Sequence, residues 1–167
     1  MRSSENEIAE GLTQRAFTDS ALFERTFDEG MALVEETARY LDGAGRREAR
    51  DLPRKAAMLY AGESMRVTTR LMQTASWLLV QRAVRDGEME PDAAFSERYR
   101  LGSKEICLAG SAEGLELLPA MLVDLLARSD SLYRRIARLD EVLFEQAGPA
   151  PGARAHISRL EQAFGGE

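Results

Sequence analysis

The feature that most constrains the fold is a run of helix-compatible residues from Asp51 to Asp86, which nothing interrupts after Pro53. Proline is tolerated in the first turn of a helix, where its missing N–H has no partner to lose, but not in the interior. We therefore predict one continuous helix that is capped by Asp51 and ends at Asp86-Gly87. At 1.5 Å per residue it is roughly 50 Å long, so the rest of a small domain must pack along it.

This predicted helix is apolar around much of its circumference. One side of it carries Leu71, Trp77, Leu78 and Val80. The other face alternates large flexible residues with small ones, at spacings of four and three: Met58, Gly62, Met65, Thr69, Met72, Ser76, Leu79 and Ala83. Such a face allows a neighbouring helix to approach closely, with methionine filling the gaps. We predict that this helix is the packing spine of a bundle, with Trp77 and the methionines in the core, and that Ser76→Leu overpacks that core.

Two further helices are predicted on either side of the long one. Asp19 or Ser20 can cap a helix that ends at Asp42-Gly43-Ala44-Gly45, a helix connector. A third helix begins near Pro119, and one face follows a heptad pattern with a single polar interruption, the stripe being Leu118, Leu122, Leu125, Ser129, Leu132, Ile136, Leu139 and Leu143.

No stretch shows the alternating apolar and polar residues of a strand, so the predicted fold class is all-α. We expect an antiparallel three-helix bundle with a long central helix and short extra helical turns after Pro91. The predicted organisation is a polar mobile leader over residues 1–17, the bundle domain over 18–147, and a flexible C-terminal tail over 148–167.

The tail begins at Gly148-Pro149-Ala150-Pro151-Gly152, which cannot continue a helix. Beyond it Ile157, Leu160 and Phe164 recur at helical spacing, in a segment too short to be stable as an isolated helix. The tail must therefore dock, either on its own bundle or on a partner protein. Both possibilities are open at this point.

Composition excludes several classes of protein. The net charge of −6 argues against a surface that neutralises nucleic-acid phosphates. No apolar run is long enough for a membrane span, and the acidic N-terminus does not resemble a secretory signal, so we expect a cytoplasmic protein. Cys107 is the single cysteine, which rules out an internal disulfide and indicates a core or loop residue.

Catalytic chemistry is not predicted. His156 is the only histidine and lies in the tail, so no Ser-His-Asp or Cys-His arrangement and no di-iron site of the helical-bundle type can form. We expect a non-enzymatic protein with no cofactor and no metal. The charged residues that attract interest are Glu63, Arg66 and Arg70, in the middle of the long apolar helix. They either pair with Glu35 or Glu36 of the first helix or contact a partner protein.

Two segments resemble the RcdA family, the regulators of CtrA degradation of alphaproteobacteria. They are Gly30–Gly43 (GMALVEETARYLDG) and Glu63–Val84 (ESMRVTTRLMQTASWLLVQRAV), the second closed by Gly87-Glu88-Met89. Residues Ser129–Asp140 resemble the family more loosely. The resemblance implies a three-helix bundle that forms a homodimer and has a flexible C-terminal tail.

The resemblance also implies an accessory adaptor that brings cell-cycle substrates to the ClpXP protease together with other regulators. The expected partners are ClpXP components, other adaptors and substrate regulators, with recruitment to a cell pole. The candidate contact residues are Glu63, Arg66 and Arg70 in the bundle and Ile157, Leu160 and Phe164 in the tail. An alternative is a structural dimerisation or scaffold protein, for which the heptads of the third helix would suffice. A small-molecule-binding regulator would need a polar pocket, for which the methionine-lined seam leaves little room.

Overall fold

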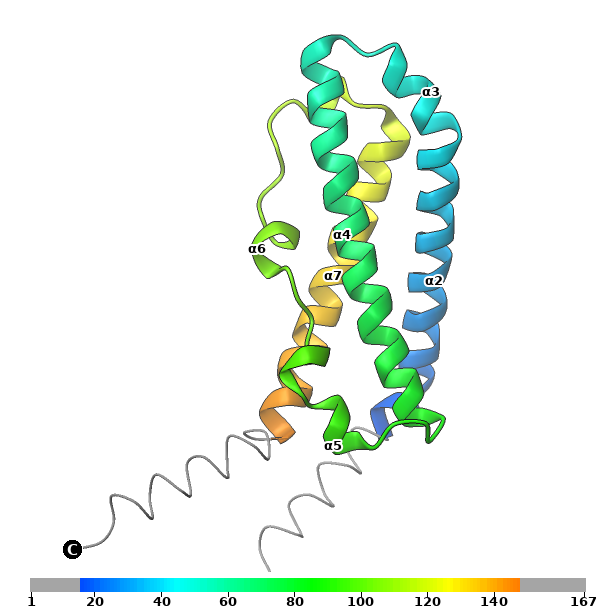
Figure 1. The fold of residues 1–167 in the computed structure, drawn as a ribbon, viewed down its shortest axis with the longest axis vertical. Helices are drawn as coiled ribbons and strands as arrows, with labels where there is room; N and C mark the ends of the chain where they lie inside the picture. Colours follow the sequence, from blue (N-terminus) through cyan, green and yellow to red (C-terminus); the bar gives the residue numbers. More distant parts are fainter. Residues whose placement is uncertain (1–15, 148–167) are drawn as a thin grey trace, which may run out of the picture.

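In a computed structural model of the chain, residues 16–147 are described and contain helices but no strand, which confirms the all-α prediction (Figure 1). A helical turn covers residues 16–18. The elements that follow are α2 (Ala21–Asp42), α3 (Ala44–Arg50), α4 (Arg54–Arg85), α5 (Pro91–Ala94), η1 (Glu97–Tyr99), α6 (Lys104–Cys107), η2 (Leu115–Leu117) and α7 (Ala120–Ala147). The predicted tail lies outside the described residues.

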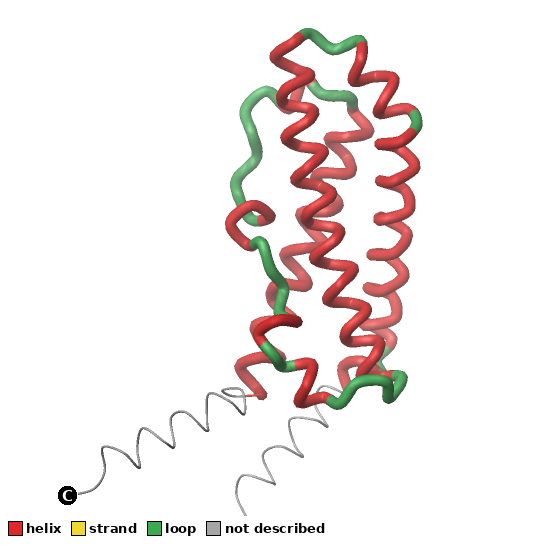
Figure 2. Tube along the Cα trace, viewed as in Figure 1, coloured by secondary structure: helices red, strands yellow, loops and turns green. Residues whose placement is uncertain are grey.

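The three long helices α2, α4 and α7 form the bundle (Figure 1). α2 runs antiparallel to both of the others, as ion pairs near opposite sequence ends show: Glu24 with Arg85 at 3.1 Å and Glu36 with Arg128 at 2.6 Å. α4 and α7 run parallel to each other. The chain must therefore return along the bundle between them, and it does so in residues 86–119, here called the strap. Figure 2 shows the strap as short helical turns joined by loops.

The helix boundaries follow local chemistry. The Ser20 hydroxyl accepts a hydrogen bond from the N–H of Phe23 at 3.2 Å and caps α2, as predicted. The connector after α2 is the short helix α3, where Gly45 is buried: a Cβ there would lie 2.5 Å from Tyr60 Oη, so a side chain is excluded. α4 begins after Pro53 rather than at Asp51, because residues 51–53 form the turn that leaves α3.

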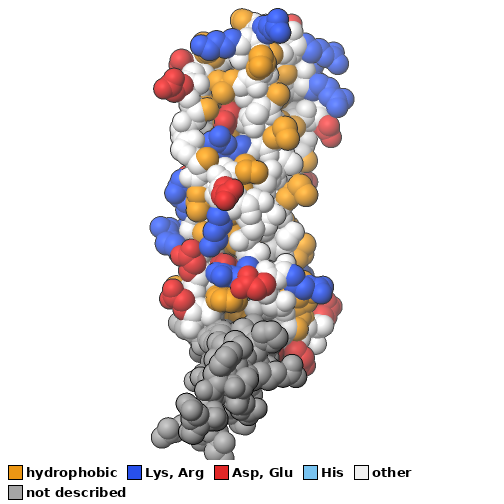
Figure 3. All heavy atoms as spheres, turned by 60° about the vertical axis from the view of Figure 1, so that its left-hand side comes forward, with side chains coloured by type: hydrophobic (Ala, Val, Ile, Leu, Met, Phe, Trp, Pro, Cys, Tyr) orange, Lys and Arg blue, Asp and Glu red, His pale blue; other side chains and the backbone are white. Residues whose placement is uncertain are grey.

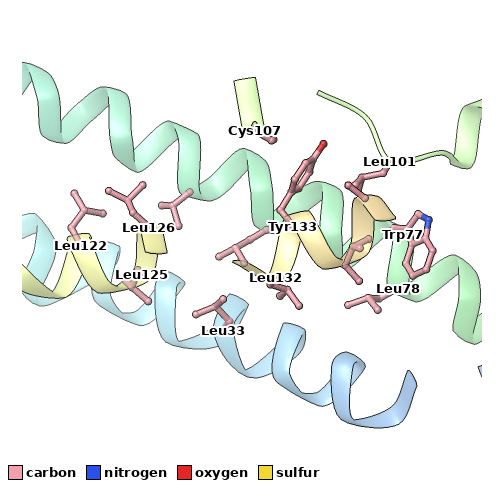
Figure 4. Close-up of a cluster of buried hydrophobic side chains, with 14 of the residues drawn as sticks. Leu33, Trp77, Leu78, Leu101, Cys107, Leu122, Leu125, Leu126, Leu132 and Tyr133 are labelled. Carbon is pink, nitrogen blue, oxygen red and sulfur yellow. The ribbon is translucent and has the colours of Figure 1, made fainter. Parts of the chain in front are cut away.

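The core lies between the three long helices and the inner side of the strap (Figure 4). The predicted stripe of α7 faces this core, and Leu122, Leu125, Leu132 and Ile136 are fully buried. α2 and α4 approach closely at Gly30, where a Cβ would lie 2.7 Å from Leu78 Cδ1. Because the heptad face of α7 is buried inside the bundle, it is not available to pair two copies of the chain.

The predicted core face of α4 is wrong. Met58, Met65, Met72 and Leu79 are 69%, 72%, 65% and 53% exposed, and Ser76 is also exposed. The buried side of α4 is the opposite one, which includes Val67, Leu71, Trp77 and Leu78; Trp77 is in the core, as expected.

The physical reason is that the opposite side carries the branched and aromatic side chains, which fill a core better than separated methionines do. A leucine at position 76 therefore points away from the bundle, and the expected overpacking of the core by Ser76→Leu is withdrawn.

Candidate protein-interaction surfaces

Arg70 is the most buried residue of the predicted charged cluster, with 4% of its surface exposed. Its Nε donates to the carbonyl of Cys107 at 2.9 Å and its Nη1 to the carbonyl of Leu126 at 3.3 Å, while Nη2 pairs with Asp130 Oδ1 at 2.9 Å. Burial lowers the pKa of Arg70, and Asp130 opposes that shift by stabilising the charged form. Arg70 thus joins α4 to α7 and to the strap.

Arg66 makes a second tie to the strap, by donating from Nη1 to the carbonyl of Gly110 at 2.9 Å. It also lies 3.5 Å from Glu63. The predicted pairing of the cluster with Glu35 or Glu36 is wrong: Glu35 binds Arg39 and Glu36 binds Arg128. The cluster lies on the side of α4 that faces the strap and α7, so α2 is out of reach.

Beside the cluster, α4, the strap and α7 line a polar pocket of about 300 Å³ that is open on one side. Glu63 is buried on its wall, and its contact with Arg66 is a distant one for a buried carboxylate. Arg134 lies at the rim and binds Asp130 at 2.8 Å. The residues that line the pocket are Glu63, Arg66, Arg70, Ala109, Ser111, Leu115, Val123, Leu126, Ala127, Asp130 and Arg134. A pocket with charges of both signs suits a polar segment of another protein.

The exposed face of α4 is a second surface, here called the α4 stripe: Met58, Gly62, Met65, Thr69, Met72, Ser76, Leu79 and Ala83. Hydrophobic side chains lie at intervals along the length of the molecule in Figure 3. Between Lys55 and Arg82 the only charged residues are those of the cluster, in a chain that is 30% charged. A row of exposed apolar side chains in a region depleted of charge is typical of a protein interface. That absence of charge was the signal in the sequence that could have identified this face.

An apolar groove of about 310 Å³ adjoins the stripe on the α2 side. α2 contributes Val34, Thr37, Ala38, Leu41 and Asp42, and α4 contributes Thr68, Leu71, Met72 and Ala75. Because Met72 belongs to both, the groove and the stripe meet at this residue. Sequence reasoning missed the groove, since it placed this side of α4 in the core.

The other predicted features are placed as follows. Cys107 is fully buried, and burial raises the pKa of its thiol, as expected for a core cysteine. His156 and the tail residues Ile157, Leu160 and Phe164 lie outside the described residues. Within residues 16–147, His, Cys, Asp and Glu side chains nowhere gather in a group of three or more that could hold a metal ion. None of the described helices is long and apolar enough to cross a membrane.

The fold and these surfaces define an all-helical bundle protein suited to binding other proteins. The sequence profile of a family described as "Protein of unknown function (DUF1465)" matches residues 14–164. The crystal structure of RcdA from Caulobacter crescentus CB15 is similar to this chain at 55% sequence identity and a TM-score of 0.64, over 78% of this chain and 97% of that one. The chain belongs to this family, which confirms the predicted resemblance to RcdA. No curated protein matches the chain significantly.

Proposed function

We propose that this protein is a non-enzymatic adaptor in regulated proteolysis, which helps to deliver cell-cycle regulatory substrates to the ClpXP protease. The observation that carries the proposal is the 55% identity to RcdA over 97% of that chain, together with the adaptor role that the family resemblance implies. CtrA degradation and recruitment to a cell pole belong to the same proposal. Its location is cytoplasmic, and it acts as a homodimer without a cofactor.

An adaptor must hold at least two partners, and the bundle offers separate surfaces for them. The polar pocket is lined by Glu63 and by Arg66, which is partly exposed and also holds the strap through the carbonyl of Gly110, whereas the donors of the buried Arg70 are committed to the bundle. We therefore place a partner contact at the pocket, with Arg70 as the residue that holds its walls together. In the tail, Ile157, Leu160 and Phe164 are proposed to dock on a partner as a helix in a groove.

Affinity capture from a cell lysate with a proteolytically inactive ClpXP trap tests the proposal. We expect candidate substrates in the trap when this protein is present and a clear loss of them when it is absent. Arg66→Glu reverses a charge in the pocket and should reduce capture about tenfold, since the charge pattern of an interface selects its partners. It also removes the hydrogen bond to the carbonyl of Gly110, so its melting temperature is measured beside its capture. Arg138→Glu reverses an exposed charge elsewhere on α7 and serves as the matched control. Equal capture with and without the protein would refute the adaptor role.

Truncation at Gly148 tests the tail. Because the tail is proposed to dock on a partner and not on its own bundle, we expect the melting temperature to stay unchanged while delivery of substrate to ClpXP is lost. The two measurements are thermal unfolding and substrate half-life in a reconstituted reaction. A lower melting temperature would mean that the tail docks on its own bundle. Unchanged stability with undiminished degradation would remove the tail from the mechanism.

The second candidate function is a structural dimerisation or scaffold protein without a role in proteolysis. The α7 heptads cannot support it, because they are buried. The exposed α4 stripe favours it, since that surface would pair helices without any protease. A protein that self-associates but recovers no substrate with the ClpXP trap would support this second function.

A further inference from the structure

We infer that the α4 stripe pairs two copies of this chain about a two-fold axis, with their α4 helices antiparallel. The inference rests on the homodimer of the proposed function. It specifies which face of the chain forms the interface, in which direction the two helices run and which residues lie opposite each other. The stripe runs from Met58 to Ala83, which at 1.5 Å per residue is about 39 Å of helix. The strap lies on one side of it and α2 on the other, so α4 itself is the open face of the bundle (Figure 1).

The order of large and small residues in the stripe is self-complementary. A two-fold interface requires that if one residue contacts a second residue of the other copy, the second also contacts the first. One antiparallel register then places every large residue of the stripe opposite a small one. The opposed residues of the two copies are Met58 and Ala83, Gly62 and Leu79, Met65 and Ser76, and Thr69 and Met72. Alternating large and small side chains lets two helices interdigitate at close distance.

The charges at the ends of the stripe support the same register. One further step of the repeat in each direction reaches Lys55 and Asp86, which this register places opposite each other at both ends of the interface. Asp86 is exposed and binds Arg82 and Arg85 of its own chain at 3.4 and 3.3 Å. A parallel in-register pair would instead place lysine opposite lysine, aspartate opposite aspartate and methionine opposite methionine. Charge and volume therefore both favour the antiparallel arrangement.

The oligomeric state of the purified full chain is the first test. Sedimentation equilibrium should give about twice the chain mass of 18.5 kDa. Met72→Glu buries an unpaired carboxylate in the interface and should weaken the dimer about 100-fold, leaving a monomer at micromolar concentration. The matched control is Val142→Glu on α7, where valine is 48% exposed, and it should remain dimeric. A monomeric wild-type protein, or a Met72→Glu variant that dimerises normally, would overturn the inference.

Disulfide cross-linking tests direction and register. Met65→Cys and Ser76→Cys, mixed and oxidised, should form a cross-linked heterodimer, because the register brings these positions together. Ser76→Cys alone should not cross-link, since its two copies would lie about 16 Å apart along the helices and a disulfide needs Cα atoms within about 7 Å. Cys107 is fully buried and stays out of the reaction. A homodimeric disulfide of Ser76→Cys would show a parallel pair and refute the proposed direction.

Both tests use purified protein without a protease, so their failure is separable from failure of the adaptor role. A dimer that recovers no substrates with the ClpXP trap would refute the adaptor role and leave this interface intact. A monomer that recovers them would refute this interface and the homodimer of the proposed function, and would leave the adaptor role intact.

Discussion

Arg70→Ala is expected to lower the free energy of unfolding by about 3–5 kcal/mol, because it leaves two buried carbonyls without this charged donor, at about 1–3 kcal/mol each, and removes the packing of a buried side chain. The substitution leaves Asp130 without its buried partner. It also removes the donors that reach the carbonyls of Cys107 and Leu126, so the strap and α7 lose a shared tie to α4. Urea denaturation followed by far-ultraviolet circular dichroism measures the change.

Arg134→Ala is the matched control, because Arg134 binds the same carboxylate at 2.8 Å but is 47% exposed in its side chain. Exposed ion pairs contribute little, so the expected loss is at most about 1 kcal/mol. Equal losses for Arg70→Ala and Arg134→Ala would contradict the view that burial and the two carbonyl bonds make Arg70 important. They would point to the charge of Asp130 alone.

The long helices were predictable because their signals are local. Ser20 caps α2 through its own side chain, Pro53 precedes α4, and the heptad spacing of α7 selects one face for burial. Which face of α4 is buried could not be predicted in the same way. That helix is apolar on both sides, and its hydrophobic period alone cannot decide which side meets α2 and α7.

The partners of the charged cluster depend on contacts that are distant in sequence. Local reasoning predicted that Arg70 needs a partner, but Asp130 lies 60 residues further along the chain. The strap that brings Cys107 and Gly110 to the cluster has irregular backbone, with positive φ at Ser103 and Gly114. Such turns leave little periodic signal, and therefore the polar pocket that the strap helps to enclose could not be predicted.

Asp140 of α7 is a structural residue that joins three parts of the fold. It is buried, and its Oδ1 accepts hydrogen bonds from Trp77 Nε1 at 3.0 Å and from the N–H of Leu101 at 3.3 Å. Its Oδ2 accepts one from Arg100 at 3.1 Å. A single carboxylate thus joins α4, α7 and the strap near the end of the bundle.

Asp140→Ala is expected to lower the free energy of unfolding by about 3–5 kcal/mol. It leaves the donors of Trp77 and Leu101 buried without an acceptor, at about 1–3 kcal/mol each, and removes the ion pair with Arg100. Chemical denaturation followed by the fluorescence of Trp77, the only tryptophan, measures both the stability and the surroundings of the indole.

Two further variants separate the acceptor from the charge. Asp140→Asn keeps an oxygen that can accept from Trp77, so we expect it to lose less than half as much stability as Asp140→Ala. Glu141→Ala removes the neighbouring carboxylate, which is 55% exposed in its side chain and pairs with Lys104, and should cost at most about 1 kcal/mol. If Asp140→Ala is no more destabilising than Glu141→Ala, the strap is held by its apolar contacts, such as Leu101 in the core, and not by this carboxylate.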